Sequence, residues 1–156
     1  MLMEQAQLSN GLMPIRGQML LYQCSPSPIQ HVINDGNRYL VCRQDGMLLA
    51  GSVEEEAGYN CVTTDQALAG IRQWAENTMP ILRETPVIKS WAGLRPGSFD
   101  GLPYMGAAPG FRNLFVAAGH FRSGLHMSCG TAQIMADLML GRPTEIDLTP
   151  FRVARG

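Results

Sequence analysis

One strand–turn–helix unit near the end of the chain constrains the fold more than any other feature. The run "NLFVAAG" (113–119) is short and almost continuously apolar, which predicts a strand buried on both faces. After the turn "HFRSG", residues 125–141 carry apolar side chains at helical spacing, and Gly141 and Pro143 predict the end of that helix. A glycine turn between a buried strand and a helix start is typical of cofactor sites, because the first helical turn offers free N–H groups.

The earlier part of the chain predicts antiparallel strands. Two apolar runs flank Asp45-Gly46 in "RYLVCRQDGMLLAGS" (38–52), and this dipeptide favours a type I′ hairpin turn. The runs at 17–24 and 85–94 also have the length and composition of strands. We therefore expect a hairpin with one further strand before it and one after it.

Residues 63–80 predict a helix between the hairpin and the last of these strands. Thr63 and Gln66 fit a capping box at its start, and Pro80 is expected to end it. The apolar residues at helical spacing are Leu68, Ile71, Ala75 and Met79.

Composition argues against several classes of partner. The 156 residues are 46% hydrophobic and 16% charged, which is typical of a globular domain with a hydrophobic core. The formal net charge is -1 and no run of Lys or Arg occurs, which argues against a nucleic-acid partner. No apolar stretch reaches the length of a membrane span, and residues 1–23 lack the pattern of a signal peptide. These features predict a cytoplasmic protein.

The cysteines and histidines do not form a metal-binding pattern. The four cysteines have irregular spacing without a CxxC motif, so we expect neither a zinc site nor a disulfide framework. We expect reduced, buried thiols at Cys24, Cys42, Cys61 and Cys129. The three histidines, His31, His120 and His126, are too scattered to indicate a metal site.

Several motifs then occur together and in order, namely "PIRGQML", "RYLVCRQDG", "WAGLRPGSFDGLPYMG", "NLFVAAGHFRSGL" and the terminal "FRVAR". With these motifs the chain resembles the C-terminal portion of the glycine oxidase group, within the D-amino-acid oxidase superfamily of FAD-dependent oxidoreductases. Members of that superfamily begin with a Rossmann unit carrying GxGxxG, a pattern that these residues lack. The resemblance implies an α+β fold. It comprises a substrate-binding domain (13–107), in which helices flank an antiparallel or mixed sheet, and the last strand and helix of a Rossmann-like FAD domain (108–156).

The resemblance also implies roles for individual residues. Arg95 of "GLRP" matches the arginine that holds the substrate carboxylate, Tyr39 matches a tyrosine whose hydroxyl contacts that carboxylate, and Arg122 is a second candidate. Outside this context, Arg95 would be interpreted as part of a surface ion pair or as a packing residue, and Tyr39 as an ordinary strand aromatic. Asn37 and Glu54 depart from the residues of some relatives, which leaves the substrate open.

The segment 120–126 matches the part of the family that passes beside the flavin ring. Its backbone N–H groups are expected to face the pyrimidine edge of the ring, where a helix N-terminus stabilises negative charge. Cys129 stands where relatives commonly carry a proline, and tight strand–helix packing is the alternative role for the glycines of the segment. The cofactor-binding residues implied are His120, Phe121, Arg122, Ser123, Gly124, Leu125 and His126.

The function implied is oxidation of glycine or another small amine, with dioxygen reoxidising FAD to give hydrogen peroxide and the imine available for thiamine thiazole synthesis. The resemblance implies no catalytic acid or base, since the cofactor carries the chemistry. The chain alone is expected to be an inactive fragment that binds FAD weakly or not at all. Apolar surface near 113–140 would then favour a homo-oligomer. The alternatives are an oxidase or dehydrogenase for sarcosine or a D-amino acid, and an isolated, non-catalytic binding domain.

Overall fold

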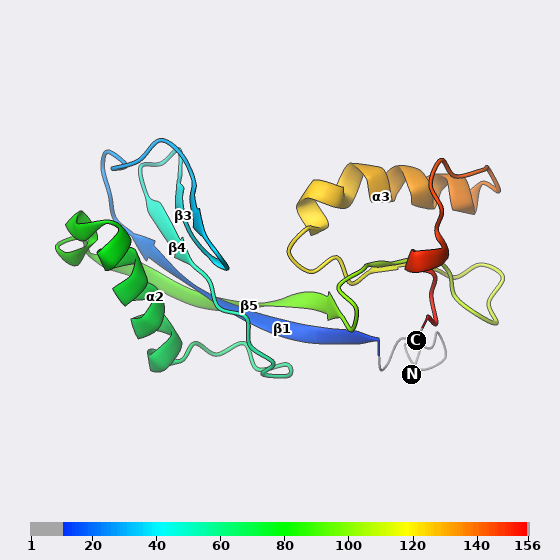
Figure 1. The fold of residues 1–156 in the computed structure, drawn as a ribbon, viewed down its shortest axis with the longest axis horizontal. Helices are drawn as coiled ribbons and strands as arrows, with labels where there is room; N and C mark the ends of the chain where they lie inside the picture. Colours follow the sequence, from blue (N-terminus) through cyan, green and yellow to red (C-terminus); the bar gives the residue numbers. More distant parts are fainter. Residues whose placement is uncertain (1–10, 156) are drawn as a thin grey trace. The chain divides into compact units, whose positions relative to one another are not determined.

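The computed structural model describes residues 11–155, which fall into two compact units (Figure 1). One unit spans Arg16–Leu94, and the other joins Arg95–Gly156 to Met1–Ile15. The first ten residues, which begin the segment examined for a signal peptide, and the last residue lie outside the described part. The boundaries between these units fall after Ile15 and after Leu94, whereas the resemblance implies a domain boundary between residues 107 and 108. The functional division into a substrate-binding and an FAD-binding part stays a prediction.

A five-stranded sheet has the strand order β2-β3-β4-β1-β5. The strands are β1 (Leu12–Tyr22), β2 (Ile33–Asp35), β3 (Arg38–Cys42), β4 (Leu48–Gly51) and β5 (Val87–Ser98). The pairs β2–β3, β3–β4 and β1–β4 are antiparallel. The β3–β4 pair is the predicted hairpin, whereas the short strand β2 was not predicted. Both β1 and β5 are longer than the sequence pattern indicates, and both pass from one unit into the other.

The predicted hairpin between β3 and β4 is confirmed, but its predicted turn type is wrong. A type I′ turn needs a positive φ at both central residues, whereas Gly46 has a φ of 82° and Asp45 is not among the residues with positive φ. The Gly46 N–H donates to the Arg43 carbonyl at 3.1 Å, so the glycine ends the turn rather than occupying its centre. The Asp45 carboxylate binds the Met47 N–H at 3.1 Å and so holds this longer connection.

The core of the Arg16–Leu94 unit lies between one face of the sheet and helix α2 (Asp65–Thr78). Strand residues that share this face alternate with residues on the other face, as the pleat requires. A short 3-10 helix, η1 (Pro80–Arg83), follows α2 and adds Leu82 to the core. The buried residues of this core are Leu20, Tyr22, Cys24, Leu40, Leu48, Ala50, Ile71, Ala75 and Leu82.

The helix predicted over 63–80 is confirmed, but Thr64 rather than Thr63 caps it. The Thr64 hydroxyl accepts the Ala67 N–H at 3.4 Å. A long-range contact explains the shift, because the Thr64 N–H donates to Oε1 of the fully buried Gln18 at 2.8 Å. Gln18 on β1 therefore fixes where α2 begins.

Gln18 belongs to a buried polar network that ties the segment before α2 to β1. Glu55 Oε2 accepts from Gln18 Nε2 and from Arg16 Nε, each at 2.8 Å. Burial alone raises the pKa of Glu55, but these hydrogen bonds outweigh it and lower the pKa. Arg16 also donates to the Val62 carbonyl at 2.9 Å, which satisfies the buried guanidinium further.

The other unit contains a two-stranded antiparallel sheet and a helix. Strand β6 (Tyr104–Ala107) pairs with β7 (Phe115–Ala118), and α3 (Gly124–Met139) follows, with a 3-10 helix η2 (Thr149–Phe151) near the end. The predicted strand and helix are therefore present, and Gly141 ends α3 with a φ of 65°. The expectation that the strand is buried on both faces is wrong for this chain, since Ala117 is exposed and its neighbours on β7 are half-buried.

Arg155 closes the unit against β6. Its guanidinium lies 3.8 Å from the centroid of the Tyr104 ring and donates to the Pro103 carbonyl at 3.1 Å. The side chain of Arg155 is only 8% exposed, and the Asp100 carboxylate compensates its positive charge. Residues near the end of the chain therefore hold the segment between β5 and β6.

All four cysteines are free thiols, but the expectation that they are buried holds only in part. Cys24 is buried and Cys42 half-buried, whereas Cys61 and Cys129 are exposed. Cys61 lies in the polar segment before α2, and Cys129 lies in α3. Within residues 11–155, no helix combines the length and the apolar character that crossing a membrane requires.

Candidate functional site

Arg95 lies near the end of β5, where a backbone contact links the strand to the turn after β7. The Arg95 side chain is half-buried. The carbonyl of the next residue, Pro96, accepts the backbone N–H of Phe121 at 3.0 Å. Proline suits this position because β5 lies at the end of the strand order, where a missing N–H leaves no broken ladder. The turn is therefore attached directly beside Arg95.

The turn needs glycine at its start. Gly119 has a φ of 83°, which disfavours other residues. A Cβ atom there would lie 3.1 Å from Leu12 Cδ2 and 3.4 Å from both Ser98 Cβ and Tyr104 Cδ2. Phe121 also has a positive φ, of 49°. The chain thus turns sharply and stays close to the end of β5, which supports the packing role considered for this glycine.

Helix α3 begins without a side-chain cap. Ser123 makes no capping hydrogen bond with its side chain, and the first turn contains no acidic residue. The first helical bond runs from the Met127 N–H to the Ser123 carbonyl at 2.9 Å. The Ser123 N–H donates to the His120 carbonyl at 2.9 Å, so the N–H groups of the first helical turn, after Ser123, carry the partial positive charge of the helix start. This start fits the electron-rich pyrimidine edge of a flavin.

His120 connects the turn to the body of α3. Its Nε2 lies 3.0 Å from the Thr131 hydroxyl oxygen. Partial burial lowers the pKa of His120, so the ring is neutral near pH 7. Of the residues predicted to bind the cofactor, Phe121 and Gly124 are half-buried like His120. The exposed ones are Arg122, Ser123, Leu125 and His126.

Tyr39 belongs to the other unit, on β3. It is half-buried, and its hydroxyl donates to Met19 Sδ at 3.4 Å. Asn37 and Glu54, whose departure from some relatives leaves the identity of the substrate undetermined, are both exposed. The joint action of Tyr39 and Arg95 on one ligand stays a prediction.

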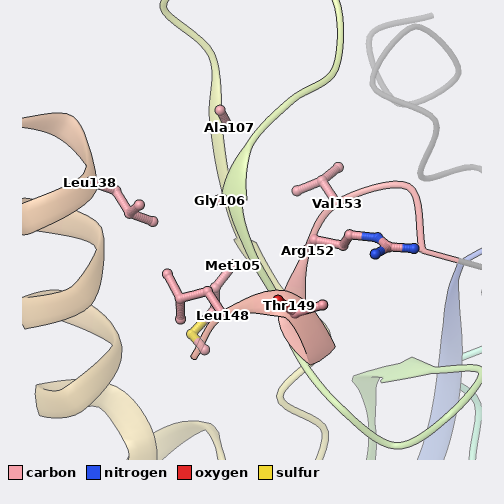
Figure 2. Close-up of a pocket in the computed structure, with 8 residues that line it drawn as sticks. All are labelled: Met105, Gly106, Ala107, Leu138, Leu148, Thr149, Arg152 and Val153. Carbon is pink, nitrogen blue, oxygen red and sulfur yellow. The ribbon is translucent and has the colours of Figure 1, made fainter. Parts of the chain in front are cut away.

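Two of the cavities formed by residues 11–155 lie in the unit that carries Arg95. One of them, of about 320 Å³, lies between α3, β6 and η2. Figure 2 shows Leu138 and Leu148 directed toward each other across this cavity, and the Arg152 guanidinium extends away from Leu138. Its lining is mainly apolar, which is typical of a packing crevice. The residues that line it are Met105, Gly106, Ala107, Leu138, Leu148, Thr149, Arg152 and Val153.

The second cavity, of about 440 Å³, lies between β7 and α3 and reaches the turn. His120 and Gly124, both predicted from the sequence, line it. The other lining residues were not predicted as part of a site, although those on α3 recur at helical spacing. They are Phe115, Ala117, Ser128, Thr131, Ala132, Met135 and Met139.

Comparison with known proteins places these features in a family. The profile of a family described as "FAD dependent oxidoreductase" matches residues 1–138. A glycine oxidase from Pseudomonas aeruginosa is 38% identical over 143 residues, which cover 92% of this chain and 39% of that protein. The hydrogen cyanide synthase subunit HcnC from Pseudomonas protegens is 33% identical, with 91% of this chain and 34% of that protein covered.

A solved structure shares the arrangement of the backbone. The crystal structure of glycine oxidase from Geobacillus kaustophilus superimposes with a TM-score of 0.92 at 29% identity, covering 99% of this chain and 42% of that one. The chain therefore spans well under half the length of the relatives that it matches.

Proposed function

Because the chain belongs to the family of FAD-dependent oxidoreductases, we propose that it forms the substrate-binding part and the last strand and helix of the FAD-binding part of an amino-acid oxidase. Glycine is the substrate that we propose first, since a glycine oxidase is 38% identical to this chain. Dioxygen is the proposed electron acceptor, with hydrogen peroxide as a product. The imine product would hydrolyse or enter thiazole synthesis for thiamine.

One contact carries this proposal, namely the hydrogen bond from the Phe121 N–H to the Pro96 carbonyl at 3.0 Å. It attaches the proposed flavin-facing turn to the residue that follows the proposed carboxylate anchor, Arg95. A cofactor and a substrate that react with each other need such closely spaced binding groups. The contact therefore supports a common site for both.

The proposed role of Arg95 is to bind the substrate carboxylate. A planar guanidinium forms two parallel hydrogen bonds to a carboxylate and so fixes its orientation as well as its charge. In the proposal, the Tyr39 hydroxyl donates to the same carboxylate and Arg122 is a second cationic contact. Binding the carboxylate in this way directs the α-carbon of the amino acid toward the cofactor.

The turn and the start of α3 are proposed to hold the flavin. In the segment from His120 to His126, the N–H groups of Phe121 and Ser123 donate to the Pro96 and His120 carbonyls. The N–H groups at the start of α3 would therefore face the pyrimidine edge of the flavin, where the partial positive charge of the helix start stabilises electron density. When bound, FAD supplies the redox chemistry by accepting a hydride from the substrate. The protein then needs to bind and orient the substrate rather than to supply an acid or a base.

A chimaeric enzyme tests this proposal. The segment of the Pseudomonas aeruginosa glycine oxidase that matches this chain is replaced by the chain itself, and peroxide formation from glycine is measured. We expect glycine oxidation by the chimaera and a rise in KM of about 100-fold for Arg95→Ala, since a charge-assisted bidentate contact contributes about 3 kcal/mol. Arg95→Lys should fall between these two proteins, because an ammonium cannot form the paired contact.

The control is Arg112→Ala, which removes an exposed arginine from the connection between β6 and β7. This variant should leave KM for glycine unchanged. If Arg95→Ala oxidises glycine with the KM of the unmodified chimaera, Arg95 is not the carboxylate anchor.

A different small amine is the second candidate substrate. Asn37 and Glu54 are exposed and differ from some relatives, so they are the positions at which substrate choice is expected to vary. The same chimaera is supplied with glycine, sarcosine and D-alanine, and a different electron acceptor is added in a parallel assay. A higher kcat/KM for sarcosine or D-alanine than for glycine would replace the first candidate.

A further inference from the structure

Tyr39, Gly51 and Met19 form one row across three neighbouring strands of the sheet. Gly51 on β4 lies opposite Met19 on β1 and opposite Tyr39 on β3, and these strands are adjacent in the order β3-β4-β1 (Figure 1). Residues that oppose each other on paired strands share a face of the sheet. The neighbouring row, Leu20, Ala50 and Leu40, belongs to the core that includes α2 residues. The row with Tyr39 therefore lies on the face away from α2.

The absence of a side chain at Gly51 makes room for its two neighbours in the row. A Cβ atom there would collide with Met19 Sδ and would lie 2.6 Å from Met19 Cε and 3.3 Å from Tyr39 Cζ. Gly51 is not among the glycines with a positive φ, so its backbone conformation is open to other residues. A larger residue at this position would therefore compete for the space above β4 that the Met19 and Tyr39 side chains occupy, and its backbone would not be strained.

The Tyr39 hydroxyl uses this space to reach Met19. It donates to Sδ at 3.4 Å, and Met19 is 8% exposed, so the sulfur is held by surrounding protein. A thioether is a weak acceptor, whereas a carboxylate accepts a much stronger, charge-assisted hydrogen bond. The sulfur can therefore orient the O–H group without competing strongly with a carboxylate.

We propose that Met19 and Gly51 are positioning residues that hold the Tyr39 hydroxyl for a substrate carboxylate. Met19 Sδ accepts the O–H in the free protein, and the carboxylate replaces the sulfur as acceptor on binding. Only a hydrogen-bond acceptor is exchanged, so no covalent bond or electron is transferred. This inference rests on the proposed function, because it assigns the carboxylate contact to Tyr39.

Methyl NMR of the full chain, with ¹³C-labelled methionine methyl groups and acetate as the probe, tests the exchange. In the unmodified chain, the Met19 methyl group should show a nuclear Overhauser contact to the Tyr39 ring, and its signal should shift as acetate is added. In Tyr39→Phe, which lacks the hydroxyl, added acetate should no longer shift the Met19 signal.

Acetate affinity in variants separates positioning from general packing. Met19→Leu keeps the volume of the side chain but removes the acceptor, and it should raise the Kd of acetate about threefold, the cost of ordering one side chain. In the Tyr39→Phe background the same change should leave Kd unaltered. Gly51→Ala, which displaces both neighbours, should raise Kd about tenfold by the same reasoning. The matched control is Met79→Leu, because Met79 packs against the core that includes α2.

Two results would overturn the inference: an equal effect of Met19→Leu with and without the Tyr39 hydroxyl, or a Met19 methyl signal that stays unchanged at saturating acetate. Since Met19→Leu preserves packing volume, the test does not depend on whether Gly51→Ala folds. The proposed carboxylate site is judged separately in the same titration. Loss of acetate binding in Arg95→Ala supports that site regardless of the result for Met19→Leu. Unchanged acetate binding in Arg95→Ala counts against it.

Discussion

Arg155 holds Asp100 with two parallel hydrogen bonds, from Nε to Oδ2 at 2.8 Å and from Nη2 to Oδ1 at 3.0 Å. The two residues are separated by 55 positions in the sequence, and their contact connects the end of the chain to the segment that leaves β5. The paired hydrogen bonds from Arg155 lower the pKa of Asp100 to about 2, from an ordinary value of 3.8. The carboxylate is thus stabilised in its charged form.

This contact predicts an acid-sensitive contribution to stability. Because the folded-state pKa is depressed, the contribution is fully present above pH 3.8 and is lost as the pH falls toward about 2. Allowing for solvent screening of this partly exposed pair, Asp100→Asn should lower the free energy of unfolding by about 1 kcal/mol at pH 6 and by much less at pH 2. Urea unfolding at both pH values measures the difference. Glu145→Gln, at an exposed carboxylate, is the control, and an equal loss at both pH values for Asp100→Asn would contradict the assignment.

A second prediction concerns the glycine before the turn. Gly119→Ala places a Cβ atom against Leu12, Ser98 and Tyr104 at a positive φ. It should lower the free energy of unfolding by about 2 kcal/mol. Gly130→Ala is the matched control, because a Cβ atom there meets nothing within 4 Å, and it should stabilise α3 by about 0.5 kcal/mol. Thermal unfolding of both variants decides the matter, and an unchanged melting temperature for Gly119→Ala would show that this close packing is not formed.

Elements with a local pattern were predicted well from the sequence. The periodicity around Ile71 and the apolar runs on each side of Gly46 indicated α2 and the β3–β4 hairpin, because each pattern reflects burial of one face. Details set by distant residues were not predictable in this way. The cap of α2 moves to Thr64 because Gln18, which is 46 residues away, binds the Thr64 N–H.

Strand β6 and the Arg155 contact show the same limit. The sequence around Tyr104 contains Pro103 and Gly106, which argue against a strand, and pairing with β7 overrides that preference. The attraction of Arg155 to Asp100 depends on a fold that no short window contains. For the site, the motif around Arg95 indicated a role through resemblance, whereas the row formed by Tyr39 and its neighbours needed the register of the sheet.

The apolar surface of α3 predicts self-association of the isolated chain. Leu125, near the start of α3, is 85% exposed, and Leu140, just after its end, is 62% exposed, and large apolar side chains that are left in water favour association. Replacing both leucines with glutamine should shift the chain toward a monomer in light scattering. Tyr59→Gln is the control, since Tyr59 is 84% exposed but lies in the other unit. A monomeric unmodified chain would contradict the expectation.

Cofactor retention by the isolated chain gives a fourth prediction. The chain has the proposed flavin-facing turn but no GxGxxG motif, which in Rossmann units binds the pyrophosphate of the cofactor. We expect that FAD mixed with the purified chain separates from it during gel filtration, as followed by absorbance near the flavin band. The chimaera with the Pseudomonas aeruginosa glycine oxidase serves as the positive control. A yellow, stoichiometric complex of the isolated chain would show that the turn and α3 suffice for tight binding.

The attachment of Phe121 to Pro96 also affects how β5 meets other molecules. An end strand normally offers free N–H and C=O groups to which a foreign strand can bind. At this point Pro96 has no N–H, and its carbonyl is already occupied. Beside Arg95, the backbone of β5 therefore offers no free hydrogen-bonding group at Pro96 to a foreign strand. This disfavours edge-to-edge aggregation without changing the arginine side chain.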